Sequence, residues 1–465
     1  MKGQNADKVC FDEDLIRRYD GRGPRYTSYP TALQFDAAFT ADDYRQAALA
    51  SNESGLPLSL YVHVPFCHSL CYYCGCNKIV TRNQTRVNRY LDNLHAEIDM
   101  QAQLFAHERM VEQLHFGGGT PTYLNELQLD ALMKKLRSAF SFDESDTHEF
   151  SIEVDPRTVS QRSIAALSDL GFNRLSLGVQ DFDEDVQKAV NRIQTAAEVQ
   201  ALVAASRDVG FKSISFDLIY GLPHQSVNSF DNTLNTVIAM RPDRLAVYNY
   251  AHLPERFKGQ RMIDAADLPL PQTKLDVLHH TIDKLDAAGY VYIGMDHFAL
   301  PDDDLVKARH AHTLQRNFQG YSTHRACDLI GLGVSSIGNI GRTYAQSAVT
   351  TMEYEALIEK GRLPIARGVA LDDDDVLRAA AIQQLMCYDE IIFVDFDKCH
   401  ATEFTDYFAA ELERLSPLAA DGLVTIDDVG VHVTAKGRLL LRNIAMVFDR
   451  YISSEPHGER YSKAI

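Results

Sequence analysis

The sequence predicts an α/β fold, with a partial TIM-like (β/α)6 barrel as its main domain, an N-terminal arm before it, and a small, mostly helical α+β domain after it. Two observations predict this fold. Between about residues 56 and 300, short apolar runs rich in β-branched and aromatic residues alternate with longer amphipathic stretches. Polar or glycine-rich residues follow almost every short run. Such alternation predicts parallel strands joined by right-handed crossovers, and the carboxyl ends of such strands meet on one face.

The first element, residues 1–55, is predicted to be an arm followed by a short helix. Prolines and glycines in the segment GRGPRYTSYPTALQF (21–35) disfavour a regular element. Its tyrosines are unusual for a disordered tail. We therefore expect an ordered segment that lies on the main domain.

The main domain is predicted to cover residues 56–370. Helical faces lie between its strands, for example the face shared by Leu91, Leu94 and Ile98, and a second face formed by leucines and an isoleucine within 275–285. The strand count of six or seven is close to a full barrel without clearly reaching eight. The strand candidates are LSLYVHV (58–64), EQLHF (112–116), FSIEVD (150–155), NRLSLGVQ (173–180), SISFDLIYG (213–221), RLAVYNY (244–250) and YVYIGMDHF (290–298).

The last element, residues 371–465, has a different composition. Four consecutive aspartates at 372–375 precede an apolar-periodic stretch, and they are more typical of a solvated helix start than of a metal site, because acidic residues favour the first turn. The segment 421–451 then predicts two short strands around a turn, followed by a helix. No obvious catalytic residue occurs in this part of the chain.

Composition argues against a nucleic-acid-binding or membrane protein. The formal net charge of the 465 residues is −18, and such a field would repel nucleic acids and anionic membranes. The sequence lacks a stretch of about 18 apolar residues, so no membrane-spanning helix is expected. The N-terminus is too polar for a signal peptide, which predicts a cytoplasmic protein. Structural disulfides are rare in that compartment.

The cysteines are concentrated in one loop. Four of the eight lie at Cys67, Cys71, Cys74 and Cys76, directly after the first predicted strand. Thiolates suit iron–sulfur clusters or zinc, but a structural zinc site usually takes two separated pairs. Three thiolates on a four-iron cluster would leave one iron open. Cys76 could be a fourth ligand that closes an electron-transfer cluster, or it could point elsewhere.

A glycine loop and two acidic residues support a catalytic site at the carboxyl ends of the strands. The loop FGGGTPTYL (116–124) follows the second strand, and its glycines would let backbone approach a ligand closely. Glu153 and Asp217 interrupt otherwise apolar strands. Each acid could instead be a satisfied buried carboxyl, and the glycines could form only a tight turn.

The cysteine spacing after the first strand of a partial barrel resembles the radical S-adenosylmethionine superfamily. Other motifs narrow the resemblance to the oxygen-independent coproporphyrinogen III oxidase family, and they run nearly from end to end. They are PRYTSYPTALQF, YVHVPFCHSLCYYCGCNKIVTR, HFGGGTPTYL, SIEVDPR, FNRLSLGVQDF, DLIYGLP, NYAHLP, GMDHFALPDD, RNFQGYST, GVSSIG and VTAKGRLL.

This resemblance implies a reaction and its cofactors. In the family, a [4Fe-4S] cluster with one open iron and two S-adenosylmethionine molecules serve the oxidative decarboxylation of coproporphyrinogen III. A 5′-deoxyadenosyl radical removes hydrogen from the β-carbon of a propionate, CO2 leaves, and two propionates become vinyl groups of protoporphyrinogen IX. The resemblance also implies an electron donor of the reduced flavodoxin or ferredoxin type, a terminal acceptor that the sequence does not name, and a monomer.

The resemblance assigns roles residue by residue. In addition to the cofactor contact given below, it assigns Tyr61 to the catalytic centre. From the residues alone, Arg192 could be an exposed helix residue and Tyr61 could be simple barrel packing. Glu153 and Asp217 could be satisfied buried carboxyls. The cluster ligands are Cys67, Cys71 and Cys74; the first S-adenosylmethionine contacts Tyr61, Gly118, Glu153 and Ile337; the second contacts Tyr73, Gly119, Thr120, Gln180, Arg192, Asp217 and Ala251; Phe318 and Gln319 lie in a motif near the cofactors.

The residues leave two alternatives each for the role of the arm arginines and for the function of the protein. Arg22 and Arg25 in the arm are candidates for binding substrate carboxylates, because arginine suits bidentate recognition, but each could equally be a surface charge. A haem-trafficking relative without oxidase activity would share the barrel and the three cysteines. The arm motif and the fourth cysteine favour the oxidase over that alternative, and the glycine loop and Glu153 disfavour an electron-transfer protein.

Overall fold

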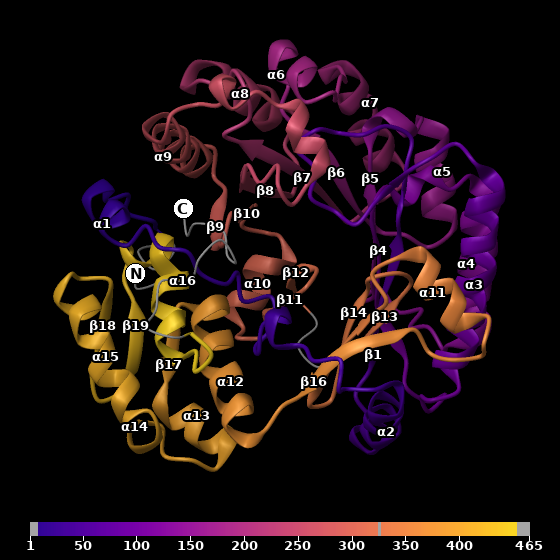
Figure 1. Cartoon of the computed structure of the whole chain (residues 1–465). Helices are drawn as coiled ribbons and strands as arrows, with labels where there is room; N and C mark the ends of the chain where they lie inside the picture. The colour runs from indigo at the N-terminus through magenta and orange to yellow at the C-terminus, as the bar shows by residue number, and fades with distance from the viewer. Residues whose placement is uncertain (1–7, 324–326, 453–465) are drawn as a thin grey trace. The chain divides into compact units, whose positions relative to one another are not determined.

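The structure, a computed structural model, describes residues 8–323 and 327–452, and the chain forms two compact units (Figure 1). Unit 1 consists of Met1–Leu33, Leu270–Arg325 and Leu371–Ile465, and unit 2 consists of Gln34–Pro269 and Ala326–Ala370. Each unit therefore gathers segments that are far apart in the sequence. Among the described helices, none combines the length and hydropathy needed to cross a bilayer.

The centre of unit 2 is a run of parallel strands that neighbour one another in chain order. This arrangement confirms the predicted α/β fold with repeated strand–helix units. The first strand is buried along nearly its whole length, as expected of a parallel strand covered on both faces. The strands are β1 (Leu58–Val64), β4 (Val111–Gly118), β5 (Glu149–Val154), β6 (Arg174–Gln180), β7 (Ser213–Tyr220) and β8 (Arg244–Asn249).

Helices cover the outer side of this sheet (Figure 1). The predicted apolar face of α3 is buried at Leu91, Leu94 and Ile98. Serine, threonine or asparagine caps the amino ends of α4, α5, α7 and α8 in capping boxes, so local sequence fixes where these helices begin. The helices of unit 2 are α2 (Ala41–Ser51), α3 (Gln84–Ala102), α4 (Glu126–Ala139), α5 (Gln161–Asp169), α6 (Glu184–Ala189), α7 (Ala196–Asp208), α8 (Val227–Met240) and α11 (Thr351–Ile358).

Unit 2 also contains an extension that the strand prediction missed. Strand β13 (Asp328–Leu332) adds to β1 in parallel, and β14 (Ile337–Ile340), β15 (Thr343–Ser347) and β16 (Ile365–Ala370) follow in antiparallel order. These strands are short and contain several glycines and polar residues, so they give little periodic signal. Two further strands, β2 (Phe66–Cys67) and β3 (Ile79–Val80), pair across the cysteine loop.

In unit 1, the predicted strand over 290–298 is wrong as a single parallel strand. It folds as an antiparallel hairpin of β9 (Val291–Gly294) and β10 (His297–Ala299). Met295 and Asp296 turn the chain with φ of 43° and 75°. The sequence GMD therefore supplies a tight turn inside an otherwise continuous apolar run.

The end of the chain confirms the predicted α+β pattern. Asp372 caps helix α12 (Asp373–Tyr388), so the acidic run is a helix start as predicted. Strands β18 (Val424–Ile426) and β19 (Gly430–Val433) precede α16 (Leu441–Ala445). The other elements of unit 1 are α1 (Glu13–Arg18), α9 (Pro271–Ala287), α10 (Asp304–His310), β11 (Gln315–Asn317), β12 (Gly320–Ser322), β17 (Glu390–Ile392), α13 (Phe393–His400), α14 (Phe404–Tyr407) and α15 (Ala409–Ala420).

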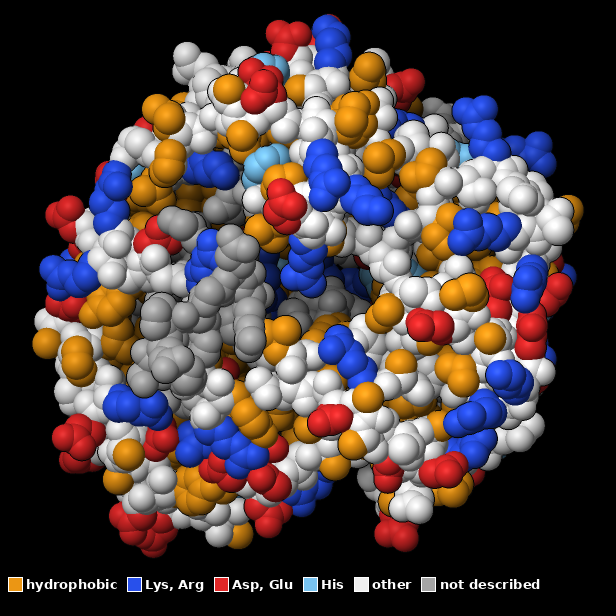
Figure 2. Space-filling view, viewed as in Figure 1, with side chains coloured by type: hydrophobic (Ala, Val, Ile, Leu, Met, Phe, Trp, Pro, Cys, Tyr) orange, Lys and Arg blue, Asp and Glu red, His pale blue; other side chains and the backbone are white. Residues whose placement is uncertain are grey.

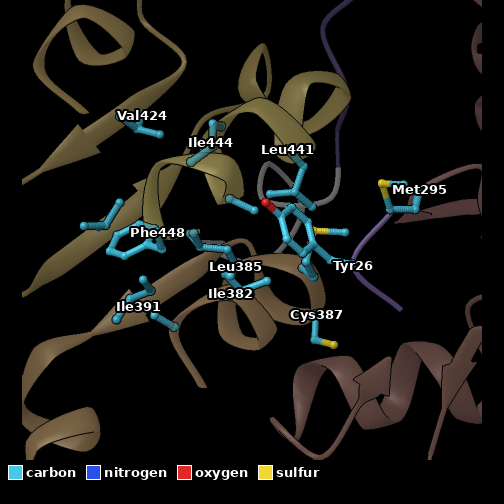
Figure 3. Packing of buried hydrophobic residues seen from close by; sticks show 14 of the residues in the cluster. Tyr26, Met295, Ile382, Leu385, Cys387, Ile391, Val424, Leu441, Ile444 and Phe448 are labelled. Carbon is cyan, nitrogen blue, oxygen red and sulfur yellow. The ribbon is translucent and has the colours of Figure 1, made fainter. Parts of the chain in front are cut away.

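One apolar core holds unit 1 together. In Figure 3, Tyr26 of the arm lies close to Leu441 of α16, with Ile382 and Leu385 of α12 in the same cluster. Met295 of the β9–β10 turn also belongs to this cluster. The arm is therefore anchored by its buried tyrosine, which agrees with the prediction of an ordered segment.

Candidate active site

The cysteine loop leaves the carboxyl end of β1 and is held on both sides. Backbone pairing joins Phe66 to Ile79 and Cys67 to Val80. Cys67 and Cys71 are buried, and Cys74 is half-buried. Thr120 of the glycine loop donates its hydroxyl to Cys67 Sγ at 3.5 Å. The loop that carries the predicted ligands is thus ordered and adjoins the glycine loop.

The third cysteine has a polar environment. A hydrogen bond from the Cys76 thiol and the nearby charge of Lys78 lower the pKa of Cys74 to about 6, against the opposing effect of burial. The Lys78 ammonium donates to the Cys74 carbonyl oxygen at 2.9 Å. A thiolate is the form that binds metal, so this environment suits a ligand.

The donor set suits an iron–sulfur cluster. Cys67, Cys71 and Cys74 lie on one loop, and thiolates are the soft ligands that such clusters take. In a four-iron cluster each thiolate binds its own iron, so three cysteines would leave one iron for another ligand.

Two arginines contact the middle cysteine. Arg157 Nη2 and Arg192 Nη1 each lie 3.4 Å from Cys71 Sγ. Asp155 at the end of β5 accepts from Arg157 at 2.7 Å and from Arg192 at 3.2 Å. The arginines hold the pKa of Asp155 below its usual value despite the opposing effect of burial. The ion-paired group Asp155–Arg157–Arg192 therefore places two hydrogen-bond donors on Cys71, one of the predicted cluster ligands.

The glycine loop approaches the cysteine loop at backbone distance. Gly118 has φ of +116°, a conformation that favours glycine, and a Cβ on Gly119 would lie 2.7 Å from the Pro65 carbonyl group. Glu153 Oε2 accepts from the Gly118 amide at 3.1 Å. Close packing of these two loops requires the glycines, so a tight turn alone does not account for them.

The two predicted acids lie in the carboxyl-terminal halves of β5 and β7. Glu153 Oε1 lies 3.3 Å from His115 Nε2, and the Glu153 side chain stays 43% exposed. Ser176 donates to Asp217 Oδ2 at 3.1 Å. Burial and the charge of Glu153 raise the pKa of Asp217 to about 7. Glu153 therefore keeps an accessible edge, whereas Asp217 tends to hold a proton near neutral pH.

Tyr61 is oriented by a neighbour that the sequence analysis did not assign. Its hydroxyl lies 3.1 Å from His63 Nδ1, and His63 Nε2 lies 3.1 Å from the Asn77 carbonyl oxygen. Burial lowers the pKa of His63, which favours neutral imidazole. Nε2–H then donates to Asn77, and Nδ1 accepts from the tyrosine. The Tyr61 hydroxyl is thus held in one orientation by a hydrogen bond.

Other predicted cofactor residues are tied to the same edge of the sheet. Gln260 Nε2 donates to the carbonyl oxygens of Tyr73 and Ala251 at 2.9 and 3.2 Å, which joins the cysteine loop to the segment after β8. Ile337 begins β14 beside β13, where Gly331 pairs with Tyr61. A Cβ on Gly331 would lie 2.8 Å from the Ile337 carbonyl carbon.

Several buried polar atoms at this edge have no partner within the described residues. They include Gln180 Oε1, Arg192 Nε and Asn249 Oδ1, at or after the ends of β6 and β8. Buried polar atoms are normally hydrogen-bonded, and orphans call for an explanation. A bound polar cofactor such as S-adenosylmethionine would provide partners, so the residues fit this group.

The structure thus gathers most of the predicted residues at one edge of unit 2. Arg192 is 6% exposed, so the alternative of a surface helix residue is wrong. Phe318, Gln319, Arg22 and Arg25 belong to unit 1. Sequence reasoning assigned no role to Asp155, Arg157, His63 or Gln260, although SIEVDPR and YVHVPFC contain the first three. A charged residue directly after a buried strand was the available signal.

Comparisons with known proteins agree with this geometry. Residues 61–237 match the Radical SAM superfamily, and residues 371–440 match the HemN C-terminal domain. An oxygen-independent coproporphyrinogen III oxidase of Pseudomonas aeruginosa is 51% identical over 99% of this chain and 100% of its own length. The enzyme of that name from Escherichia coli strain K12 is 50% identical over the same shares.

A solved structure extends the match to three dimensions. The coproporphyrinogen III oxidase HemN from Escherichia coli, a radical SAM enzyme, superposes on this chain with a TM-score of 0.91 at 50% identity. The match covers 96% of this chain and 100% of that chain. Identity and coverage at this level, together with the cysteine and glycine loops, place the chain in the oxygen-independent coproporphyrinogen III oxidase family of the radical SAM superfamily.

Proposed function

We propose that this protein catalyses the oxygen-independent oxidative decarboxylation of coproporphyrinogen III to protoporphyrinogen IX in haem biosynthesis. The observation that carries the proposal is the cysteine loop beside the glycine loop, at the same edge of the sheet as Glu153, Asp217 and Arg192. When bound there, a [4Fe-4S] cluster and S-adenosylmethionine supply a carbon-centred radical that removes hydrogen from a propionate side chain.

Within this proposal, each loop has a task that its contacts support. Cys67, Cys71 and Cys74 hold the cluster, and Thr120, Arg157 and Arg192 donate hydrogen bonds to two of these thiols. Glu153 fixes the glycine loop and keeps an exposed oxygen edge for a cofactor hydroxyl or ammonium group. The Tyr61 hydroxyl is oriented by His63, which lies two residues further along β1 and therefore on the same face of that strand.

The second S-adenosylmethionine is also part of the proposal. Its residues are Tyr73, Gly119, Thr120, Gln180, Arg192, Asp217 and Ala251, as the family resemblance implies. Orphaned atoms of Gln180 and Arg192 support a polar ligand on this side of the site. The Arg192 guanidinium bonds Cys71, Asp155 and the Gly178 carbonyl, and its buried Nε has no partner within the described residues, which leaves that N–H available to a carboxylate.

The proposed function also concerns the location, oligomeric state and electron donor of the protein. We infer a cytoplasmic monomer that receives electrons from a reduced flavodoxin or ferredoxin-type protein. Figure 2 shows Lys and Arg side chains interspersed with Asp and Glu on the face it displays. With a net charge of −18, this surface disfavours nucleic acid as a partner.

Anaerobic turnover tests the proposed function. The protein is reconstituted with iron and sulfide and supplied with dithionite, S-adenosylmethionine and coproporphyrinogen III. We expect protoporphyrinogen IX together with 5′-deoxyadenosine. Haem binding without any turnover would instead support the trafficking relative and would contradict the oxidase.

A further inference from the structure

Unit 1 gathers three arginines around the backbone of residues 23–25. Arg316 on β11 donates through Nε to the Arg25 carbonyl oxygen at 3.2 Å. Arg442 on α16 donates through Nε to the Pro24 carbonyl oxygen at 3.0 Å and also bonds the Gly23 carbonyl oxygen. The third guanidinium is that of Arg25 itself. We name Arg25, Arg316 and Arg442 the arginine cluster.

Charged groups around the cluster include one carboxylate and the arginines themselves. Arg25 forms an ion pair with Asp296 in the β9–β10 turn. Burial and the charges of Arg25 and Arg316 lower the pKa of Arg442 to about 10. Burial and the charge of Arg316 also lower the pKa of His297 to about 4. In both cases burial is the larger cause, and the neighbouring guanidinium charges act in the same direction.

Arg316 is the unusual member. It is 6% exposed, and its guanidinium carbon lies 4.8 Å from the centre of the Tyr321 ring. Within the described part of the chain, its Nη1 has no hydrogen-bond partner and no carboxylate lies at ion-pair distance from it. The side chain is therefore held through Nε and the Tyr321 ring, while Nη1 is left open.

Two other buried arginines of the same unit have a carboxylate partner. Arg309 and Arg438, which are 7% and 2% exposed, both pair with Asp389, at 2.6 and 2.8 Å. A buried cation without a counter-charge destabilises the folded state. Arg309 and Arg438 each have this carboxylate, whereas Arg316 has an open Nη1, and a buried donor without a partner calls for a ligand such as an anion.

We propose that Arg316 anchors a carboxylate-binding site in unit 1, with Arg442 adding positive charge. A carboxylate matches the planar donor fork of arginine in shape and charge. This inference rests on the proposed function, because both the tetrapyrrole propionates and the methionyl end of S-adenosylmethionine present that group. It differs from the sequence prediction: Arg22 is exposed, and Arg25 is engaged by Asp296.

Binding to the reconstituted, full-length protein tests the site. The probes are coproporphyrin III, its tetramethyl ester and S-adenosylmethionine, titrated under anaerobic conditions into wild type, Arg316→Gln, Arg316→Lys and the control Arg414→Gln. Arg414 lies in the same unit, is 54% exposed and pairs with Glu411. Loss of a charged hydrogen bond predicts binding about 10- to 100-fold weaker for Arg316→Gln, a smaller loss for Arg316→Lys and none for the control.

A comparison of the three probes shows which carboxylate the site binds. Weaker coproporphyrin binding with unchanged ester binding assigns the site to a propionate, and weaker S-adenosylmethionine binding alone assigns it to the methionyl carboxylate. Wild-type affinity for both carboxylates, in either Arg316 variant that retains the wild-type circular dichroism spectrum, would overturn the site. Turnover by the wild type is measured separately, so failure of the proposed function is distinguishable from failure of this inference.

Discussion

Cys71 is the most informative single residue of the candidate site, because two arginines and the loop backbone converge on it. Its thiol is buried and lies 3.4 Å from the guanidinium groups of both Arg157 and Arg192. The sequence showed that this cysteine belongs to a ligand motif. It did not show the arginines, since they lie 86 and 121 residues away from it in the chain.

Cys71→Ala is expected to remove the cluster. An iron site with one thiolate fewer is both less stable and differently reactive, so iron content, the charge-transfer absorbance and turnover should all fall to background. Iron and sulfide analysis with visible spectra checks this. Cys399→Ala, at an exposed cysteine of unit 1, is the matched control and should retain all three. A cluster of normal content in Cys71→Ala would refute the ligand assignment.

Arg157→Gln is expected to leave the cluster in place and lower its reduction potential. The hydrogen bond from Arg157 to Cys71 withdraws charge from the sulfur and thereby favours the reduced state. A charged hydrogen bond of about 1.5 kcal/mol corresponds to roughly 60 mV for one electron. Redox titration followed by electron paramagnetic resonance measures the shift, and Arg157→Lys should recover part of it. An unchanged potential in Arg157→Gln would contradict this role.

Among the elements of unit 2, helix α3 is joined to the loop after β13 and to helix α11 by the buried carboxyl of Glu97. Glu97 on α3 accepts from the Tyr354 hydroxyl at 2.6 Å and from the Gly333 amide at 2.7 Å. Burial raises the pKa of Glu97 to about 7. The periodicity of α3 predicted which residues face the core but gave no sign of this acid among them, because a single polar residue on an apolar face carries no partner information.

This carboxyl predicts a pH-dependent stability. Below about pH 4.5 both the folded and unfolded chains are protonated at Glu97. Between there and about pH 7 only the unfolded chain loses the proton, so the free energy of unfolding falls as pH rises. The loss from this group amounts to about 3 kcal/mol or less.

Glu97→Gln should remove this dependence, since the amide oxygen still accepts from Tyr354 and Gly333. Urea unfolding of wild type and variant at pH 5 and pH 8 checks the prediction. The variant should gain stability relative to wild type at the higher pH. An equal difference at both pH values would show that Glu97 does not titrate in this window.

Across the molecule, the fold class and the parallel strand order were predictable from the sequence. The strands β1, β4, β5, β6 and β7 are long and largely apolar, and the next α-helix after each of them has a side-chain cap at its amino end. The hairpin at 290–298 and the strands after 327 were not predictable in this way. Their form depends on positive-φ turns and on pairing with distant strands, and neither leaves a periodic pattern.

The same limit applies to the candidate site. Cysteine spacing, consecutive glycines and acids at strand ends are local features, and they identified one edge of unit 2. The Asp155–Arg157–Arg192 group, the Tyr61–His63 pair and the Gln260 bridge arise from side chains that meet only after folding. The open guanidinium of Arg316 in unit 1 is of the same kind, because only burial distinguishes it from a surface arginine.

The reaction proposed for this chain is the oxidation of two propionates of one tetrapyrrole by radical chemistry. Its decisive test is the anaerobic product ratio, measured by chromatography of 5′-deoxyadenosine and protoporphyrinogen IX from the same reaction. Each propionate requires one hydrogen abstraction, so we expect about two 5′-deoxyadenosine molecules for each protoporphyrinogen IX. Production of 5′-deoxyadenosine without any decarboxylated tetrapyrrole, or of neither product by a fully loaded protein, would rule the reaction out.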